Sequence, residues 1–214
     1  TSLDNRYSSS RAARLNFLWG VRNIGFKRVV GFDALTGAQD VRTGFQLAVL
    51  FGRSLSVLGT HDDDILVSSD VYAGVGTERS FAAIQLLGAG RQSYDANRWD
   101  DILTSGRAAW YFKASAPYTT VASTEWSGGW RQRAPFQLNL GEPRGGMRGY
   151  SGAELPGGQR LLFRLEQRWV FGNVRGNADA AAGLVGEAGR MWAGDVPFGQ
   201  TMPMKYSVGT SLFA

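Results

Sequence analysis

The chain has 214 residues, of which 43% are hydrophobic and only 19% charged, which argues against long disorder and leaves room for one domain or one barrel. Cysteine is absent, which excludes disulfides, zinc–thiolate sites and thiol catalysis. The net charge of +5 comes from arginines that stand singly rather than in runs, so we expect no nucleic-acid partner.

Alternation of apolar and polar residues dominates the chain and predicts β-strands, whose side chains point in turn to two faces. Clear alternation covers 15–22, 45–51, 65–75, 101–113, 161–171 and 205–213, and weaker alternation covers 81–91, 118–128 and 178–190. This predicts about nine strands, many of about 9–11 residues or more, the length that crosses a bilayer at a tilt. Helical periodicity is poor, no apolar run reaches the length of a transmembrane helix, and the longest turn-rich segment is 128–158.

The alternation is clearest in 161–171. One face of this strand carries Leu161, Phe163, Leu165, Trp169 and Phe171, and the other carries Arg164, Glu166 and Arg168. We expect the apolar face to meet lipid and the charged face to meet a wet lumen, because charges at mid-strand are costly inside a protein core. Aromatic residues near strand ends favour a membrane girdle: Trp19, Trp110, Phe112, Trp126 and Trp169. The alternative is a soluble β-sandwich or lipocalin-like barrel, whose strands also alternate.

An ordered set of motifs occupies 145–214. The tetrad Met147, Arg148, Gly149 and Tyr150 lies in the long segment, Glu166 lies in the next predicted strand, and Glu187 and Gly189 lie in the strand after that. This order resembles the barrels of the outer-membrane protein assembly and translocation superfamily, the bacterial surface antigen family. Its members include the BAM-complex barrel subunit, the translocation-and-assembly-module barrel and the two-partner-secretion transporters.

The chain departs from the family pattern at three positions. Met147 replaces a branched residue in the family's Val/Ile-Arg-Gly-Phe/Tyr tetrad, and Val185 and Glu187 replace the first and third residues of its Phe-x-Asp-x-Gly motif. Glu187 keeps the charge but reaches one methylene further. The resemblance covers the last third of the chain, and the first 130 residues match only in barrel-like character.

The resemblance implies an antiparallel transmembrane β-barrel of about sixteen strands in the bacterial outer membrane. Residues 1–214 would be a fragment of about nine of these strands, preceded in the family by POTRA domains. The implied function is non-catalytic and uses no cofactor or metal: assembly of outer-membrane proteins or translocation of polypeptide. The implied partners are outer-membrane lipid and lipopolysaccharide, unfolded or secreted polypeptides, and periplasmic accessory proteins.

In the family, the tetrad arginine pairs with acidic residues on the next two strands inside the lumen. A guanidinium in a lumen needs a carboxylate partner in any case. We therefore expect segment 128–158 to fold into the lumen and Arg148 to lie about 2.7–3.2 Å from Glu166, Glu187 or both. From the residues alone, Arg148 could instead be a solvated arginine on an external loop.

Other functions stay open from the sequence. A passive porin with an anion-selecting arginine lumen, or a barrel that anchors an enzyme domain such as a patatin-like lipase, has the same strand pattern. The run His61-Asp62-Asp63-Asp64 lacks the spacing of a metal site and is interpreted as a solvated turn. Asp70 and Glu125 fall on the expected lumen faces near arginines, which favours ion pairs over a glycosidase pair. We expect no enzyme.

Overall fold

The computed structural model describes residues 13–55, 57, 63–94, 97–141, 145–150, 156–174, 176 and 178–213. Nine long strands make up one antiparallel sheet: β1 (Arg14–Val30), β2 (Ala38–Ser54), β3 (Asp64–Gly76), β4 (Ser80–Ser93), β5 (Arg98–Ser115), β6 (Tyr118–Trp130), β9 (Gln159–Val174), β10 (Ala178–Trp192) and β11 (Lys205–Phe213). A second sheet pairs the short strands β7 (Leu138–Asn139) and β8 (Pro156–Gly157). Among these residues no helix is long and apolar enough to cross a membrane.

The expected nine antiparallel strands are confirmed, with six before the long segment and three after it. The three weakly alternating segments form full strands, because each pairs with a neighbouring strand on both sides. Most strands extend beyond the alternating core that predicted them, and β1 and β2 each have 17 residues. The two short strands inside the long segment were not expected.

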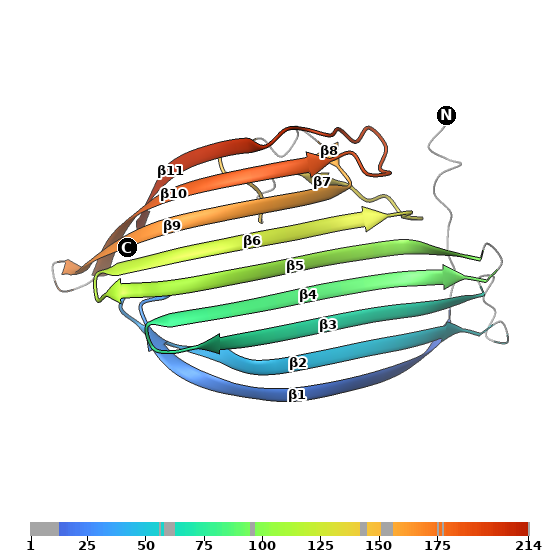
Figure 1. The fold of residues 1–214 in the computed structure, drawn as a ribbon, viewed down its shortest axis with the longest axis horizontal. Coiled ribbons are helices and arrows are strands. Elements are labelled where there is room, and N and C mark those ends of the chain that lie inside the picture. The colour runs from blue at the N-terminus through green and yellow to red at the C-terminus, as the bar shows by residue number, and fades with distance from the viewer. Residues whose placement is uncertain are drawn as a thin grey trace.

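The sheet is curved but is not closed into a barrel (Figure 1). Its hydrogen-bonded order ends at β1 on one side and at β11 on the other. Closure requires the first and last strands to pair with matching tilt and stagger. Here β1 has 17 residues and β11 has only 9, and neither pairs with the other. The closed barrel expected from the sequence is therefore not formed by the part of the chain that the structure describes.

The two faces of the sheet differ in what covers them. The long segment and the β7–β8 pair lie against one face, here called the loop-side face. The opposite face, here called the bare face, exposes large apolar side chains along most strands. Examples are Phe17, Val21, Phe45, Leu86, Trp110, Phe163, Leu165 and Val208, which are 40% or more exposed. The alternation expected for 161–171 agrees with this: Phe163 and Leu165 are on the bare face, whereas Glu166 is buried on the loop side.

The connections at the two ends of the sheet differ in length. At one end the strands are joined through 31–37, 77–79, 116–117 and 175–177. At the other end the connections are 55–63, 94–97, 131–158 and 193–204, which include the long segment. We call these the short-turn end and the long-connection end.

The β1–β2 turn crosses the loop-side face at the short-turn end. Phe32 is only 1% exposed and stacks on Tyr111 of β5, with ring centroids 5.2 Å apart. The Thr119 hydroxyl of β6 donates to the Gly31 carbonyl at 2.9 Å. Since this turn reaches β5 and β6 from β1 and β2, the sheet must curve strongly enough to bring these strands within side-chain reach.

Candidate functional site

Residues 156–158, at the C-terminal end of the long segment, are held by backbone hydrogen bonds to β6, to β10 and to the β10–β11 connection. Gly158 donates its amide to the carbonyl of Trp192 at 3.0 Å, and its own carbonyl accepts from Gly129 at 2.9 Å. Pro156 accepts from the amide of Gln200 at 2.8 Å. The segment thus begins and ends against the sheet instead of projecting from it.

An apolar cluster covers the contact between the long segment and the sheet. Leu140 and Met147 come from the segment, Leu162 and Met191 from β9 and β10, and Met202 from the β10–β11 connection. Each is at most 6% exposed, and Leu140 and Met191 are fully buried. The amide of Met147 donates to the carbonyl of Leu140 at 2.7 Å, which closes the segment on itself above the cluster.

Gly189 makes this packing possible. A Cβ at this position would lie 2.7 Å from Leu162, 3.0 Å from Leu140 and 3.1 Å from Met147. Such distances are too short for a side chain without movement of its neighbours. The absence of a side chain at Gly189 therefore lets Leu140 and Met147 lie directly on β10.

The structure brings Arg148 to Glu187, but not in the way expected. The backbone amide of Arg148 donates to Glu187 Oε2 at 2.7 Å. The guanidinium Nε lies 3.8 Å from Glu187 Oε1, and the arginine side chain is 52% exposed. The expected direct hydrogen bond from the guanidinium is thus replaced by one from the backbone and a looser ion pair.

The reason is that Arg164 occupies the better position. Arg164 of β9 is the direct cross-strand partner of Glu187 of β10. Its Nε donates to Glu187 Oε1 at 2.5 Å, and its Nη2 donates to the carbonyl of Gly146 in the long segment at 3.2 Å. Glu187, only 3% exposed in its side chain, therefore joins the sheet and the tetrad through two donors from different elements.

Glu166, the other expected partner of Arg148, pairs with Arg168 instead. It is 4% exposed, and its Oε1 accepts from Arg168 Nε at 3.0 Å. Arg168 also donates through Nη1 to the carbonyl of Phe32 at 2.6 Å. Glu166 lies at the middle of β9, and Arg168, two residues closer to the short-turn end, reaches the β1–β2 turn and not the long segment.

The remaining tetrad residues contact the wall of the sheet. Gly149 has φ of +80°, a left-handed conformation that favours glycine. The hydroxyl of Tyr150 donates to the carbonyl of Tyr206 in β11 at 3.1 Å, and its ring packs on the apolar cluster. The tetrad is therefore held by backbone polar groups of β11 and by Glu187 of β10.

The other acidic residues singled out in the sequence take part in polar pairs. Glu125 lies 3.6 Å from Arg107, and Asp70 accepts from Gln85 at 3.3 Å. In the acidic run, Asp63 pairs with Arg53, and His61 and Asp62 lie outside the described residues. The interpretation as a solvated turn is wrong for Asp64, which begins β3, is 1% exposed and pairs with Arg14 and Arg91. Within the described ranges there is no group of three or more metal-ligating side chains.

Replacing Arg148 with alanine should have a small effect on stability. Because its guanidinium is half exposed and its amide, which the substitution keeps, makes the shorter bond to Glu187, we expect a loss of about 0–1 kcal/mol in the free energy of unfolding. The measurement is urea unfolding followed by tryptophan fluorescence. A loss of several kcal/mol would mean that the guanidinium is the main anchor.

Sequence reasoning singled out the tetrad, Glu187 and Gly189, which the structure brings together, but it missed two features of this arrangement. It placed Arg164 on the correct face without identifying it as the partner of Glu187, because strand register cannot be deduced from alternation alone. It also missed the packing of Met191 and Met202 under the long segment, because the alternation of residues along a strand does not show which of them a loop covers. Chemically, the arrangement holds a long segment on one face of a sheet through buried apolar contacts and one shared carboxylate.

Comparisons of the chain with protein-family models, curated proteins and solved structures gave no match.

Proposed function

We propose that this chain is the membrane-spanning sheet of a bacterial outer-membrane barrel that assembles membrane proteins or translocates polypeptide. The observation that carries the proposal is the tetrad Met147–Tyr150, which lies on the loop-side face with Glu187 accepting the amide of Arg148. In a barrel, a long internal loop that is anchored in this way would cover part of the lumen and leave the rest open. Such an arrangement suits a channel whose opening is controlled better than a permanently open pore.

The bare face supports contact with lipid. Its exposed side chains are mainly large and apolar, and a face of this kind is expensive in water but stable in a bilayer. Aromatic pairs lie near both ends of the strands: Trp110 stacks on Phe112 toward the short-turn end, and Trp126 contacts Trp130 and Trp192 toward the long-connection end. Short turns at one end and long connections at the other are also typical of outer-membrane barrels.

The open half of the loop-side face supports a path for polypeptide. A groove of about 580 Å³ runs over β2 to β6 beside the long segment. Its walls include Leu50, Leu87, Leu103, Phe136 and Leu138, with Asp70 as a charged group. An extended polypeptide can lie in such a groove. Among the described residues, β1 and β11 each pair on one side only, so their outer edges offer backbone groups for strand addition.

A matched pair of leucines tests the membrane part of the proposal. Leu86 and Leu87 are neighbours in β4 with similar exposure, 47% and 45%, but they point to opposite faces. Since the chain has no cysteine, a fluorescent label can be placed at Leu86→Cys or Leu87→Cys alone. In vesicles that contain lipids with a nitroxide quencher at mid-chain, the label at position 86 should be strongly quenched and the label at 87 should not. Equal quenching of both labels would refute insertion as a barrel wall.

The polypeptide part is tested with the full-length protein in proteoliposomes. We expect it to promote folding of an unfolded outer-membrane protein into the vesicle, or entry of a secreted polypeptide. A protein that conducts anions across a planar bilayer but does neither would be a passive pore, and the proposed function would be wrong.

A further inference from the structure

The start of β5 contains an irregularity that presents two carboxylates to the long segment. Ala89 of β4 pairs with Leu103 and Arg91 pairs with Asp100, so that Asp101 and Ile102 together face a single residue of β4. Asp101 has φ of +49°, a conformation that non-glycine residues adopt rarely. A bulge of this kind redirects side chains, and its effect here is to aim Asp100 and Asp101 at the residues that follow β6.

These two carboxylates hold the root of the long segment, residues 131–133. Asp101 Oδ1 accepts the amide of Arg133 at 2.7 Å, and Asp100 Oδ2 accepts Arg133 Nη2 at 3.3 Å. The amide of Asp101 donates to the carbonyl of Arg131 at 2.9 Å, and Gln132 Nε2 donates to the carbonyl of Ile102 at 2.8 Å. The root is therefore attached to β5 by groups unrelated to the tetrad.

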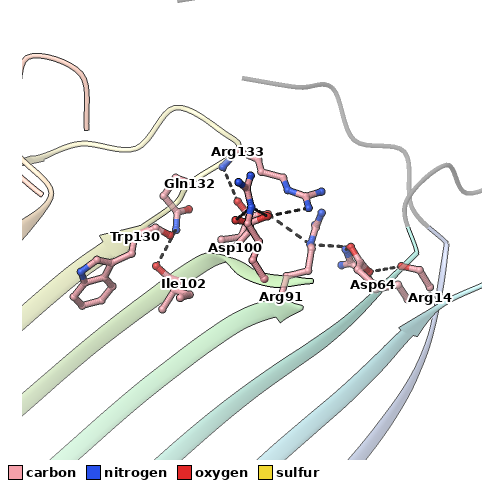
Figure 2. Close-up of polar contacts among 11 residues, drawn as sticks. Arg14, Asp64, Arg91, Asp100, Ile102, Trp130, Gln132 and Arg133 are labelled. Carbon is pink, nitrogen blue, oxygen red and sulfur yellow. Dashed lines mark hydrogen bonds and ion pairs between the residues drawn. The ribbon is translucent and has the colours of Figure 1, made fainter. Parts of the chain in front are cut away.

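The same carboxylates belong to a row of charges that reaches the edge strand β1. Figure 2 shows Asp100, Arg91 and Asp64 in a row between Arg133 and Arg14. Arg91 Nε lies 3.5 Å from Asp101 Oδ2 and 3.0 Å from Asp64 Oδ2, and Arg14 Nε of β1 lies 3.3 Å from Asp64 Oδ1. The side chains of Asp64 and Asp100 are only 1% exposed. Asp64 is held by Arg14, Arg91 and the Ser54 hydroxyl, and Asp100 by Arg98 and Arg133, so both charges depend on these partners and not on water.

We propose that Asp100 and Asp101 are positioning residues that anchor the root of the long segment, and that Arg91 and Asp64 couple this anchor to the end of strand β1. Arg91 is shared between Asp64 and Asp101. When Arg14 moves away from Asp64, the buried Asp64 carboxylate attracts Arg91 more strongly, and the ion pair between Arg91 and Asp101 weakens. A change at the free edge of β1 is thus transmitted to the long segment by rearrangement of charges. The relevance of this coupling to transport rests on the function proposed above, but the coupling itself does not.

Hydrogen exchange of the full-length protein in lipid nanodiscs tests the anchor. Asp100→Asn combined with Asp101→Asn removes both charges and keeps the side-chain shapes. We expect exchange of the amides in 131–135 to rise about tenfold or more, and exchange in 147–150 to stay unchanged because Glu187 holds that part independently. Unchanged exchange in 131–135, or an equal rise in both peptides, would overturn the second anchor. Slow exchange in β9 shows that a variant is folded.

Arg14→Gln tests the coupling. We expect it to accelerate exchange in 131–135 about threefold or more, although the ion pair of Arg14 is with Asp64 and not with those residues. The matched control is Arg53→Gln, which removes an arginine at the same end of the sheet that pairs with Asp63, 51% exposed, and should leave 131–135 unchanged. Arg14→Lys keeps the charge and should behave as the unsubstituted protein. If Arg14→Gln and Arg53→Gln have equal effects, the coupling is wrong, whatever the transport assays show.

Discussion

Replacing Glu187 with glutamine is expected to cost about 3–5 kcal/mol in the free energy of unfolding and to release the tetrad from the sheet. Glu187 is the buried carboxylate that Arg164 and the amide of Arg148 share. Without its charge, Arg164 is left largely buried, with the Gly146 carbonyl as an acceptor but without the negative charge that balances it. The cost therefore comes mainly from the stranded guanidinium and only in part from the lost hydrogen bond.

The measurement combines urea unfolding in lipid vesicles with limited trypsin digestion, in which cleavage after Arg148 reports release of the tetrad. The matched control is Glu78→Gln, since Glu78 lies exposed in the turn between β3 and β4 and the same charge is removed there. If the two variants unfold at the same urea concentration, the Arg164–Glu187 pair contributes no more than an exposed pair.

Truncation of Leu140 to alanine is expected to have the second large effect, about 2–5 kcal/mol. Leu140 is fully buried between the long segment and the sheet. It lies directly on Gly189, where a Cβ would come within 3.0 Å of it. Its removal leaves a cavity against Met147 and Met191, and the cavity cannot fill without moving the segment. We therefore expect faster trypsin cleavage after Arg148 together with the lower stability.

Leu103→Ala is the matched control for this prediction. Leu103 also lies on the loop-side face, but it is 40% exposed and borders the open groove. Its truncation removes the same atoms from a site that water or a bound chain can fill, so the expected loss is below about 1.5 kcal/mol. Equal losses for the two variants would show that the long segment does not pack on the sheet.

The guanidinium of Arg148 is expected to contribute less to the attachment of the long segment than the sequence suggested. The half-exposed guanidinium of Arg148 is a minor contact, whereas its amide, Glu187 and the apolar cluster hold the segment in place. The side chain of Arg148 is thus available to rearrange while the backbone around it stays attached.

The sequence by itself determined where the long strands lie and which of their residues share a face. Alternation is a local property, because successive side chains of an extended backbone point to opposite faces wherever the strand lies. Phe163 and Leu165 on one face and Glu166 on the other could therefore be predicted from 161–171 alone. The number and antiparallel order of the long strands followed from the same pattern and from the turn-rich segments between them.

Only the tertiary structure decided which residues meet across strands and where the sheet ends. The partner of Glu187 is Arg164 because the register of β9 and β10 places them opposite each other, and Arg168 holds the β1–β2 turn because the curved sheet brings that turn within its reach. The root anchor at Asp100 and Asp101 depends on a bulge that no alternation reveals. The physical reason is that register, bulges and closure are set by contacts between segments distant in sequence, and those contacts form only once the sheet has curved and the long segment has packed on it.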